Sequence, residues 1–557
     1  MNKETKVCQN CKTSFTIEPE DFEFYKKLGA SQPKYCPDCR FRIRCLFRNE
    51  KSLYSRKCDK CGAPVVTIYN TRSPYTVYCV KCWDSNSWDP YEYGLDYDPN
   101  RPFFKQLGEL LKKVPKKATY VSSSSKYGPN INSDYTNVAS GNKDSYLIFN
   151  SSGCEEAFYS RGVVESRDVS DIYFGMNLER CYEGINIDQC ANVQYAQNVV
   201  SSLDSQFLLN VVGLQNCFGC VNLRHKAYHY FNEPLSKTEY ERKVSAIRGS
   251  FKKTEEVKKV LSEFALKFPR RQNNNIKTVD SVGDYLFECK NLVQCFEATR
   301  TEDSKYCFSV KFLKDAYDVI GYGYDSELLL ECVGVGLSSR VVGTYWASSC
   351  HDIDYSYCVE SSEYCFGCDG LRHANYSILN KHYMKEEYQK LRAKIVTELR
   401  SKGLYGGFFP LEIAPSAYNE SVGQENLPLT RGGAEQMGFR WEEDLQMTKG
   451  KETLRSDDIP DHIHDVKDSI TSEILACISC GRNYRIIPAE LELYRKILVS
   501  LPRQCFNCRY LERIRARGPF TVYDRICAKC HKQIKTSFAP DRPEIVYCEQ
   551  CYQAEVV

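Results

Sequence analysis

The chain has 557 residues, more than one hydrophobic core usually supports, so we expect several domains. Of these residues 42% are hydrophobic and 26% are charged, and no run of eighteen apolar residues is present, which excludes a membrane-spanning helix. The formal net charge is +3, weak grounds for a polyanionic partner. The N-terminus lacks the apolar core of a signal peptide, so we expect a cytoplasmic protein with reduced cysteines.

A block of eight cysteines begins the chain, and a second block with the same spacing ends it. Adding 469 to each residue number of the first block gives the second. A CxxC pair places two thiolates on one turn, and two such pairs can surround a zinc ion. The predicted zinc ligands are Cys8, Cys11, Cys36, Cys39, Cys58, Cys61, Cys79, Cys82, Cys477, Cys480, Cys505, Cys508, Cys527, Cys530, Cys548 and Cys551.

The eight pairs predict four zinc sites, two in each block. The simplest arrangement joins neighbouring pairs, and a cross-braced arrangement of alternating pairs is the alternative. Four protein sulfurs leave no open coordination position, so we expect structural rather than catalytic zinc. An iron–sulfur cluster takes the same ligands, but zinc is more typical of repeated ribbons.

Three arginines follow the second CxxC of each block. Their spacing of i, i+4 and i+8 would place them along one face of a helix. Guanidinium groups bind phosphate, and interleaved aromatic residues suit exposed bases, so the arginines are candidates for contacting RNA. The alternatives are protein contact, a solvated face, or ion pairs with acidic residues of the central region. The candidates are Arg40, Arg44, Arg48, Arg509, Arg513 and Arg517.

Residues 89–118 connect the first block to the central region. Their apolar residues have the spacing of a short amphipathic helix, which we expect to dock on a neighbouring domain. These residues are Phe103, Phe104, Leu107, Leu110, Leu111 and Val114.

A twelve-residue period begins at about residue 131 and is clearest from Lys143 to Lys226. The second position of the repeat favours turns, and its eighth position repeats asparagine. The other positions are rich in Val, Ile, Tyr and Phe, which predicts a parallel β-solenoid with an asparagine ladder. Because a twelve-residue coil would be too narrow to enclose Tyr or Phe, twenty-four residues per coil are favoured.

The repeat unit recurs 148 residues later, with Cys217 and Cys220 matching Cys365 and Cys368. Each copy runs into charged helical sequence that we expect to cap the last coil. The fold class is therefore mainly β, with tandem β-solenoids, helical caps and a double zinc-ribbon module at each end. The expected boundaries are 1–88 zinc module, 89–118 connector, 119–235 first solenoid, 236–276 cap, 277–383 second solenoid, 384–402 cap, 403–473 tether and 474–557 zinc module.

Three motifs resemble a known family: CQNCKTSFTIEPEDFEFYKKLGASQPKYCPDCR, CFGCxxLR and EIVYCEQCY. The chain is similar to uncharacterised zinc-ribbon proteins ("probable zinc-ribbon domain") of candidate-phylum bacteria that carry a cysteine- and tyrosine-rich repeat region. The resemblance covers most of the chain. It implies four zinc ions but no assigned activity.

The sequence thus predicts a non-enzymatic zinc-binding scaffold that binds structured RNA or the ribosome through the arginine helices. The first alternative is a scaffold for protein assembly, with a protein partner or a homo-oligomer. The second is a solenoid enzyme acting on carbohydrate through His351, Asp352 and Asp354. We expect no membrane contact and no small-molecule substrate.

Overall fold

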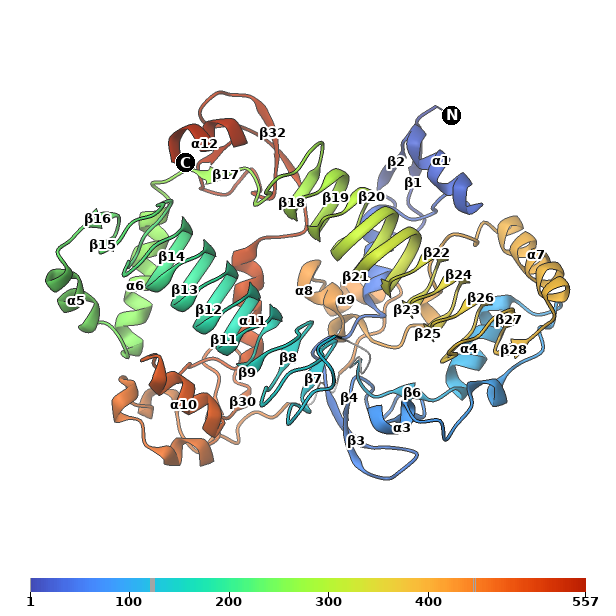
Figure 1. The fold of residues 1–557 in the computed structure, drawn as a ribbon, viewed down its shortest axis with the longest axis horizontal. Coiled ribbons are helices and arrows are strands. Elements are labelled where there is room, and N and C mark those ends of the chain that lie inside the picture. The colour runs from blue at the N-terminus through green and yellow to red at the C-terminus, as the bar shows by residue number, and fades with distance from the viewer. Residues whose placement is uncertain (1, 121–125, 444, 446, 557) are drawn as a thin grey trace.

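Two β-solenoids form the centre of the molecule, and the cysteine modules at the chain ends flank them (Figure 1). The structure is a computed structural model that describes residues 2–120, 126–443, 445 and 447–556. Among these residues, no helix is long and apolar enough to cross a lipid bilayer. The predicted fold class, mainly β with tandem solenoids between cysteine modules, is confirmed.

The first solenoid is a parallel ladder in which each residue pairs with the residue twelve positions later. Arg167 pairs with Glu179, and Val169 with Cys181. One coil therefore contains twelve residues, and the expectation of twenty-four was wrong. Its strands are β7 (Thr136–Asn137), β8 (Ile148–Phe149), β9 (Glu155–Phe158), β10 (Arg161–Val164), β11 (Arg167–Met176), β12 (Glu179–Asp188), β13 (Ala191–Val200) and β14 (Leu203–Val212).

A twelve-residue coil is feasible because the aromatic side chains lie outside it. Positive φ angles recur at every third residue, as at Asp168 and Asp171, so the coil bends four times. The residue after each bend points inward and is small or aliphatic, as in Val169 and Ile172, both fully buried. Tyr173 and its equivalents point outward and are covered by other elements.

The predicted asparagine ladder is present in the first solenoid. Asn186 donates to Asn198 over 2.9 Å, and Asn198 donates to Asn210 over 3.0 Å. Asn222, at the last position of the column, instead donates to the carbonyl of Pro269. A short hairpin of β15 (His229–Tyr230) and β16 (Glu233–Pro234) follows the last coil.

The second solenoid has the same construction with two irregularities. Its first coil is one residue short, because Ile276 pairs with Phe287, eleven positions later. One residue is inserted near Gly321–Asp325, where five successive residues have positive φ angles. The strands are β18 (Val282–Phe287), β19 (Lys290–Thr299), β20 (Glu302–Lys305), β21 (Phe308–Gly336), β22 (Ser339–Val342), β23 (Tyr345–Ser348), β24 (His351–Asp354), β25 (Tyr357–Glu360), β26 (Glu363–Phe366), β27 (Ser377–Ile378) and β28 (Lys381–His382).

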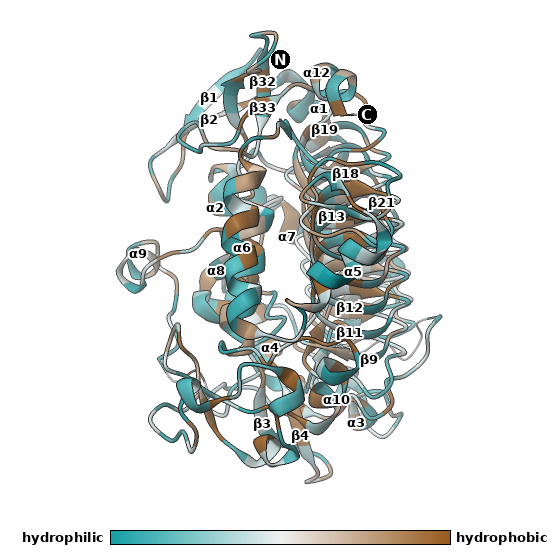
Figure 2. Ribbon diagram, turned by 90° about the vertical axis from the view of Figure 1, so that its left-hand side faces the viewer, coloured by the Kyte–Doolittle hydropathy of each residue, from teal (hydrophilic) through white to brown (hydrophobic). Residues whose placement is uncertain are grey.

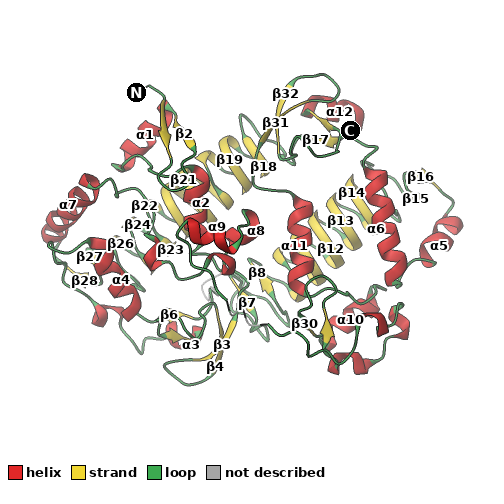
Figure 3. Ribbon diagram, turned by 180° about the vertical axis from the view of Figure 1, so that it is seen from behind, coloured by secondary structure: helices red, strands yellow, loops and turns green. Residues whose placement is uncertain are grey.

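Helices cover one side of the solenoid layer and leave the other side open (Figures 2 and 3). The predicted connector helix is present as α4 (Phe103–Lys113), whose Phe103 packs against Phe366 of the second solenoid. The two segments predicted as caps are helical. In the first segment, α5 (Lys237–Ser245) and α6 (Phe251–Ala265) bury outward aromatic residues of the first solenoid. In the second segment, α7 (Lys385–Ser401) contacts β27 of the second solenoid.

The two end modules contain corresponding elements. The N-terminal module has β1 (Glu4–Val7), β2 (Ser14–Ile17), α1 (Pro19–Leu28), α2 (Pro37–Cys45), β3 (Tyr54–Lys57), β4 (Pro64–Thr67), β5 (Val77–Tyr78) and α3 (Val80–Trp83). The C-terminal module has β29 (Leu475–Ala476), β30 (Asn483–Tyr484), α10 (Pro488–Lys496), α11 (Phe506–Arg517), β31 (Tyr523–Ile526), β32 (Gln533–Thr536), β33 (Val546–Tyr547) and α12 (Glu549–Val556). Each module also pairs with one short strand from outside it. Strand β6 (Lys116–Lys117) pairs with β5, and β17 (Arg270–Arg271) pairs with β33.

The described part of residues 403–473 is folded against the rest of the molecule. It contains α8 (Val422–Asn426), α9 (Arg431–Gln436) and short 3-10 turns. Helix α8 contacts both α2 and α11, so it lies between the two end modules. The tether therefore lies against the protein, which is one of the two possibilities that the sequence did not decide between.

Candidate metal centres and the buried arginines

The structure brings the sixteen predicted ligands together as four separate groups. Each group joins two neighbouring CxxC pairs, and its sulfur atoms all lie within 4.8 Å of one another. The neighbouring arrangement is therefore confirmed, and the cross-braced alternative is excluded. The groups are Cys8/Cys11/Cys36/Cys39, Cys58/Cys61/Cys79/Cys82, Cys477/Cys480/Cys505/Cys508 and Cys527/Cys530/Cys548/Cys551.

The sulfur spacing fits a single tetrahedral metal ion. Thiolates about 2.3 Å from zinc lie about 3.8 Å from one another along the edges of the tetrahedron. One sulfur pair in each group measures 3.5, 4.0, 3.8 and 3.7 Å, in chain order. A multi-iron cluster would need sulfur atoms farther apart, because the cluster stands between them. Each group could therefore hold one ion with no coordination position left for a substrate.

Backbone N–H groups prepare these thiols for ionisation. The N–H of Cys79 donates to Cys58 Sγ over 3.2 Å, and in the second module the N–H of Cys548 donates to Cys527 Sγ over the same distance. Burial raises the pKa of both accepting thiols, but backbone N–H groups outweigh it and lower each pKa to about 6. A metal ligand must be a thiolate, so these donors favour metal binding.

All six candidate arginines are buried, which contradicts their prediction as nucleic-acid contacts. None is more than 7% exposed, and Arg44 is fully enclosed. Arg48 also lies beyond the end of α2, so the three N-terminal arginines do not share one helix. Five of the six side chains form ion pairs with solenoid carboxylates, one of the alternatives weighed on the sequence, and Arg48 pairs with Glu50 of its own module. A guanidinium group in such a pair is closed to phosphate.

The N-clamp, as we name Arg40 and Arg44 with Asp318 and Glu331, joins α2 to β21. Arg40 donates from Nε to Asp318 Oδ2 over 3.0 Å, and Arg44 pairs with both carboxylates. All four side chains are at most 5% exposed. Burial raises the pKa of Glu331 to about 7, although Arg44 lowers it. Removing one member of such a group costs about 3–5 kcal/mol, because it leaves an uncompensated buried charge.

The C-clamp is the corresponding set of Arg509 and Arg513 with Asp171, which joins α11 to β11. Arg509 donates from Nε to Asp171 over 3.0 Å, and Arg513 donates from Nη1 over 2.6 Å. Burial raises the pKa of Asp171, but the two guanidinium groups outweigh it and lower the pKa below its usual value.

The two clamps share the same arrangement around Asp318 and Asp171, whereas the Glu331 contact belongs to the N-clamp alone. Asp171 and Asp318 are 147 residues apart, which is the repeat distance before the inserted residue. Arg40 lies 5.1 Å above the ring of Tyr306, and Arg509 lies 4.9 Å above the ring of Tyr159, its equivalent. The N-terminal module therefore holds the second solenoid, and the C-terminal module holds the first. Each end module therefore docks on the solenoid that is farther from it in the sequence.

A central ion network joins both modules to both solenoids. Arg48 pairs with Glu50 over 2.6 Å, and Glu50 pairs with Arg161 over 2.7 Å. Arg161 and Arg517 lie 3.5 and 3.1 Å from opposite oxygens of Glu297. Burial raises the pKa of Glu50, but Arg161 and Arg48 outweigh it and lower the pKa to about 2. Four parts of the chain therefore depend on one buried set of charges.

The carboxylates of these contacts are the functional residues that the sequence did not single out. Asp171 and Asp318 each stand at a bend of the repeat, where acidic residues are common. Comparing the two solenoids position by position would have found the pair, because each copy has Asp at this position and Tyr twelve residues earlier, at Tyr159 and Tyr306. Glu50 and Glu297 have no equivalent acidic partner and no signal in the sequence.

The solenoid cysteines are packed as buried thiols and are not brought together with other ligands. Cys217, Cys220 and Cys368 each donate to the carbonyl two residues earlier and to another nine residues later. Cys365 donates to the carbonyl of Glu363, two residues earlier. Among the described residues, the groups of ligands that could hold a metal ion are the four cysteine groups above. All thirty cysteines are free thiols.

The carbohydrate-enzyme set of His351, Asp352 and Asp354 is divided between two faces of the second solenoid. Asp354 is buried, where it accepts hydrogen bonds from Arg392 and Tyr405. His351 and Asp352 lie at the open side, with His351 half exposed. The three side chains therefore do not converge on one substrate.

Comparisons with known proteins add no family. No protein-family model matches the chain, and no curated protein matches it. Among solved structures, a protein of Desulfovibrio desulfuricans G20 described as an acetyltransferase matches 47% of this chain and 68% of its own, at 9% identity and a TM-score of 0.11. A similarity this low supports no conclusion about fold or function. The resemblance to zinc-ribbon proteins stays a prediction.

Proposed function

We propose that this protein is a non-enzymatic scaffold in the cytoplasm, which holds zinc at its four cysteine groups and binds a partner protein on the open faces of its solenoids. The burial of the six arginines carries the proposal. It indicates that the zinc modules act as internal clamps, so their role is to fix the two solenoids in place.

The cysteine groups support zinc in a structural role. Four thiolates complete the tetrahedral shell that zinc prefers, and no ligand position remains for catalysis. Zinc binding contributes on the order of 10 kcal/mol to the folding of small modules. A reducing compartment suits a chain in which every cysteine is a free thiol.

The charge pattern of the open faces favours protein over nucleic acid. Opposite charges alternate along the first solenoid, where Lys143 lies 2.7 Å from Glu155 and Arg167 lies 3.6 Å from Glu179. A surface of paired charges has little attraction for a phosphate backbone, which is bound by unpaired cations. Regular rows of this kind can instead match a partner protein by complementary charge.

The test is to purify the tagged full-length chain from its own cells, with and without ribonuclease, and to identify what accompanies it. We expect a defined protein partner that resists ribonuclease. Exchanging the charges of one pair, with Arg167→Glu and Glu179→Arg together, should release the partner while four zinc ions per chain remain. Recovery of RNA alone, or a partner that ribonuclease releases, would overturn the proposal.

A further inference from the structure

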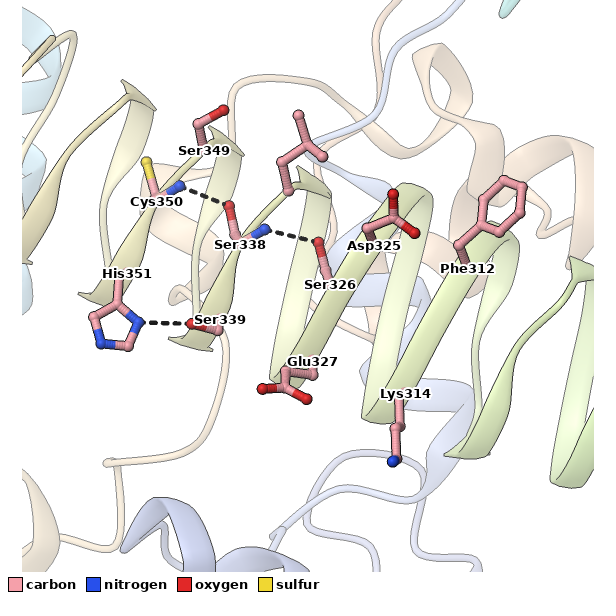
Figure 4. A pocket seen from close by; sticks show the side chains of 11 residues that line it. Phe312, Lys314, Asp325, Ser326, Glu327, Ser338, Ser339, Ser349, Cys350 and His351 are labelled. Carbon is pink, nitrogen blue, oxygen red and sulfur yellow. Dashed lines mark hydrogen bonds between the residues drawn. The ribbon is translucent and has the colours of Figure 1, made fainter.

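A groove runs along the open side of the second solenoid, across four successive coils (Figure 4). Its volume is about 540 Å³, and its floor is formed by Ser326, Ser338 and Cys350, which belong to the interior of the solenoid. Two rows of outward side chains form its walls. One row is Phe312, Asp325, Leu337 and Ser349, and the other is Lys314, Glu327, Ser339 and His351.

The first solenoid shows how the inserted residue changes this face. Lys314 and Glu327 correspond to Arg167 and Glu179, which form an ion pair over 3.6 Å. In the second solenoid the insertion lies between the two positions. Within the described part of the chain, the side chains of Lys314, Asp325 and Glu327 form no ion pair and no hydrogen bond. Three charged groups therefore face the groove with their hydrogen-bonding capacity free.

One wall also carries a hydrogen bond between successive coils. His351 Nδ1 is hydrogen-bonded to Ser339 Oγ over 2.6 Å. Asp352 Oδ2 lies 2.9 Å from His351 Nε2, and Arg340 pairs with the other oxygen of Asp352. The Ser339 hydroxyl keeps a lone pair that can accept a hydrogen bond from a ligand hydroxyl.

An aromatic platform adjoins the opposite wall. The ring of Phe312 lies 5.1 Å from that of Tyr324, and Tyr324 stacks on Tyr322 at 5.6 Å. Tyr322 is in turn stacked with Trp346 at 6.5 Å. Tyr322 and Tyr324 are 44% and 38% exposed, and both belong to the segment with the inserted residue. The inserted residue thus separates Lys314 from Glu327, and the segment that contains it also exposes the two tyrosine rings.

We propose that this groove binds a neutral oligosaccharide. A row of donors and acceptors beside exposed aromatic rings suits a ligand with hydroxyl groups at its edge and C–H groups on its face. The coil spacing of about 4.8 Å is close to the length of one sugar unit in an extended chain, so successive units can meet equivalent positions. The two free carboxylates repel a polyanion, which disfavours nucleic acid. The ladder has no unpaired strand edge here for an extended peptide.

The experiment is calorimetric titration of the full-length, zinc-loaded protein with four neutral hexasaccharides: cellohexaose, xylohexaose, chitohexaose and maltohexaose. We expect at least one to bind with a Kd below about 1 mM. Binding should also change the fluorescence of Trp346, because its stacking partner Tyr322 would contact the sugar. Glu327→Ala and Tyr324→Ala should each weaken binding at least tenfold, since both side chains are exposed and their loss leaves the fold intact.

The matched control is Glu179→Ala, the same position in the first solenoid. It should leave the Kd unchanged. If none of the four hexasaccharides binds at about 5 mM, the proposal is wrong. It is also overturned if Glu179→Ala weakens binding as much as Glu327→Ala. These results are independent of the scaffold function, which is tested by the purified partner and not by sugar binding.

Discussion

Arg40 donates a hydrogen bond from Nε to Asp318 Oδ2 across 3.0 Å, although 278 residues separate the two in sequence. The contact connects the beginning of the chain to the middle of its second solenoid. Its counterpart between Arg509 and Asp171 connects the end of the chain to the first solenoid, also across 3.0 Å. The zinc modules therefore fasten the molecule from both ends, and breaking either contact should have local and separable consequences.

The first prediction concerns Arg44, which is fully buried between two carboxylates. Replacing it with leucine should destabilise the docked N-terminal module by about 3–5 kcal/mol, because Asp318 and Glu331 lose a compensating charge. Hydrogen exchange of the α2 amides measures the loss locally. Arg42→Leu is the matched control, because the second block carries Leu511 at that position. Equal exchange in both variants would contradict the clamp.

The second prediction is that the two clamps act independently. Asp171→Asn should speed proteolysis of the C-terminal module and leave the N-terminal module protected, because both ion-pair partners of Asp171 belong to α11. Asp318→Asn should do the reverse. Limited trypsin digestion followed by mass spectrometry distinguishes the two. Release of both modules by either variant would show that they are coupled through the central network.

The third prediction concerns metal content. The protein should bind four zinc ions per chain, measured by elemental analysis of protein purified without chelator. Replacing Cys58 and Cys61 with serine should lower this to three, because the other groups do not share ligands with theirs. Cys217→Ala, which removes a buried solenoid thiol, should leave four ions bound. A fifth ion, or loss of an ion on this control substitution, would contradict the assignment.

The fourth prediction is a pH dependence at Glu331. Burial raises its pKa to about 7 from 4.5, with Asp318 also raising it and Arg44 and Arg40 opposing. A carboxyl whose pKa is raised on folding stabilises the protein below its unfolded value and loses that contribution as the pH rises through its folded value. The free energy of unfolding should therefore fall from about pH 4.5 to about pH 7.

Urea denaturation of Glu331→Gln should show a smaller fall over that range, because the side chain no longer ionises. Glu183→Gln is the control, since Glu183 holds the equivalent position in the first solenoid and pairs with Lys258 at its edge. This variant should keep the wild-type slope. The same slope in both variants would exclude Glu331 as the source.

The fifth prediction tests the narrow interior. Val193 points inward and is fully buried, whereas Ala191, two residues earlier, points outward on the open side. Val193→Phe should destabilise the first solenoid by about 1–3 kcal/mol or prevent its folding, because a twelve-residue coil has no room for the ring. Ala191→Phe should be tolerated. Thermal unfolding compares the two, and equal melting temperatures would contradict the geometry.

The sequence by itself determined the features that depend on local spacing. A CxxC turn brings two sulfurs together whatever surrounds it, and a strict twelve-residue period repeats the same bend, so both the ligand groups and the solenoid could be predicted. The amphipathic spacing around Leu107 likewise predicted α4. Each of these follows from residues close together in the chain.

Only the tertiary structure decided the rest. The number of residues per coil depended on whether Tyr173 and its equivalents point inward or outward, and the period is the same in both cases. The role of Arg44 depended on Glu331, which lies 287 residues away. A guanidinium group has the same local sequence signal whether it meets phosphate or a buried carboxylate. Long-range docking selects the partner of each guanidinium group. Here it places all six candidate arginines in buried ion pairs that hold the fold together.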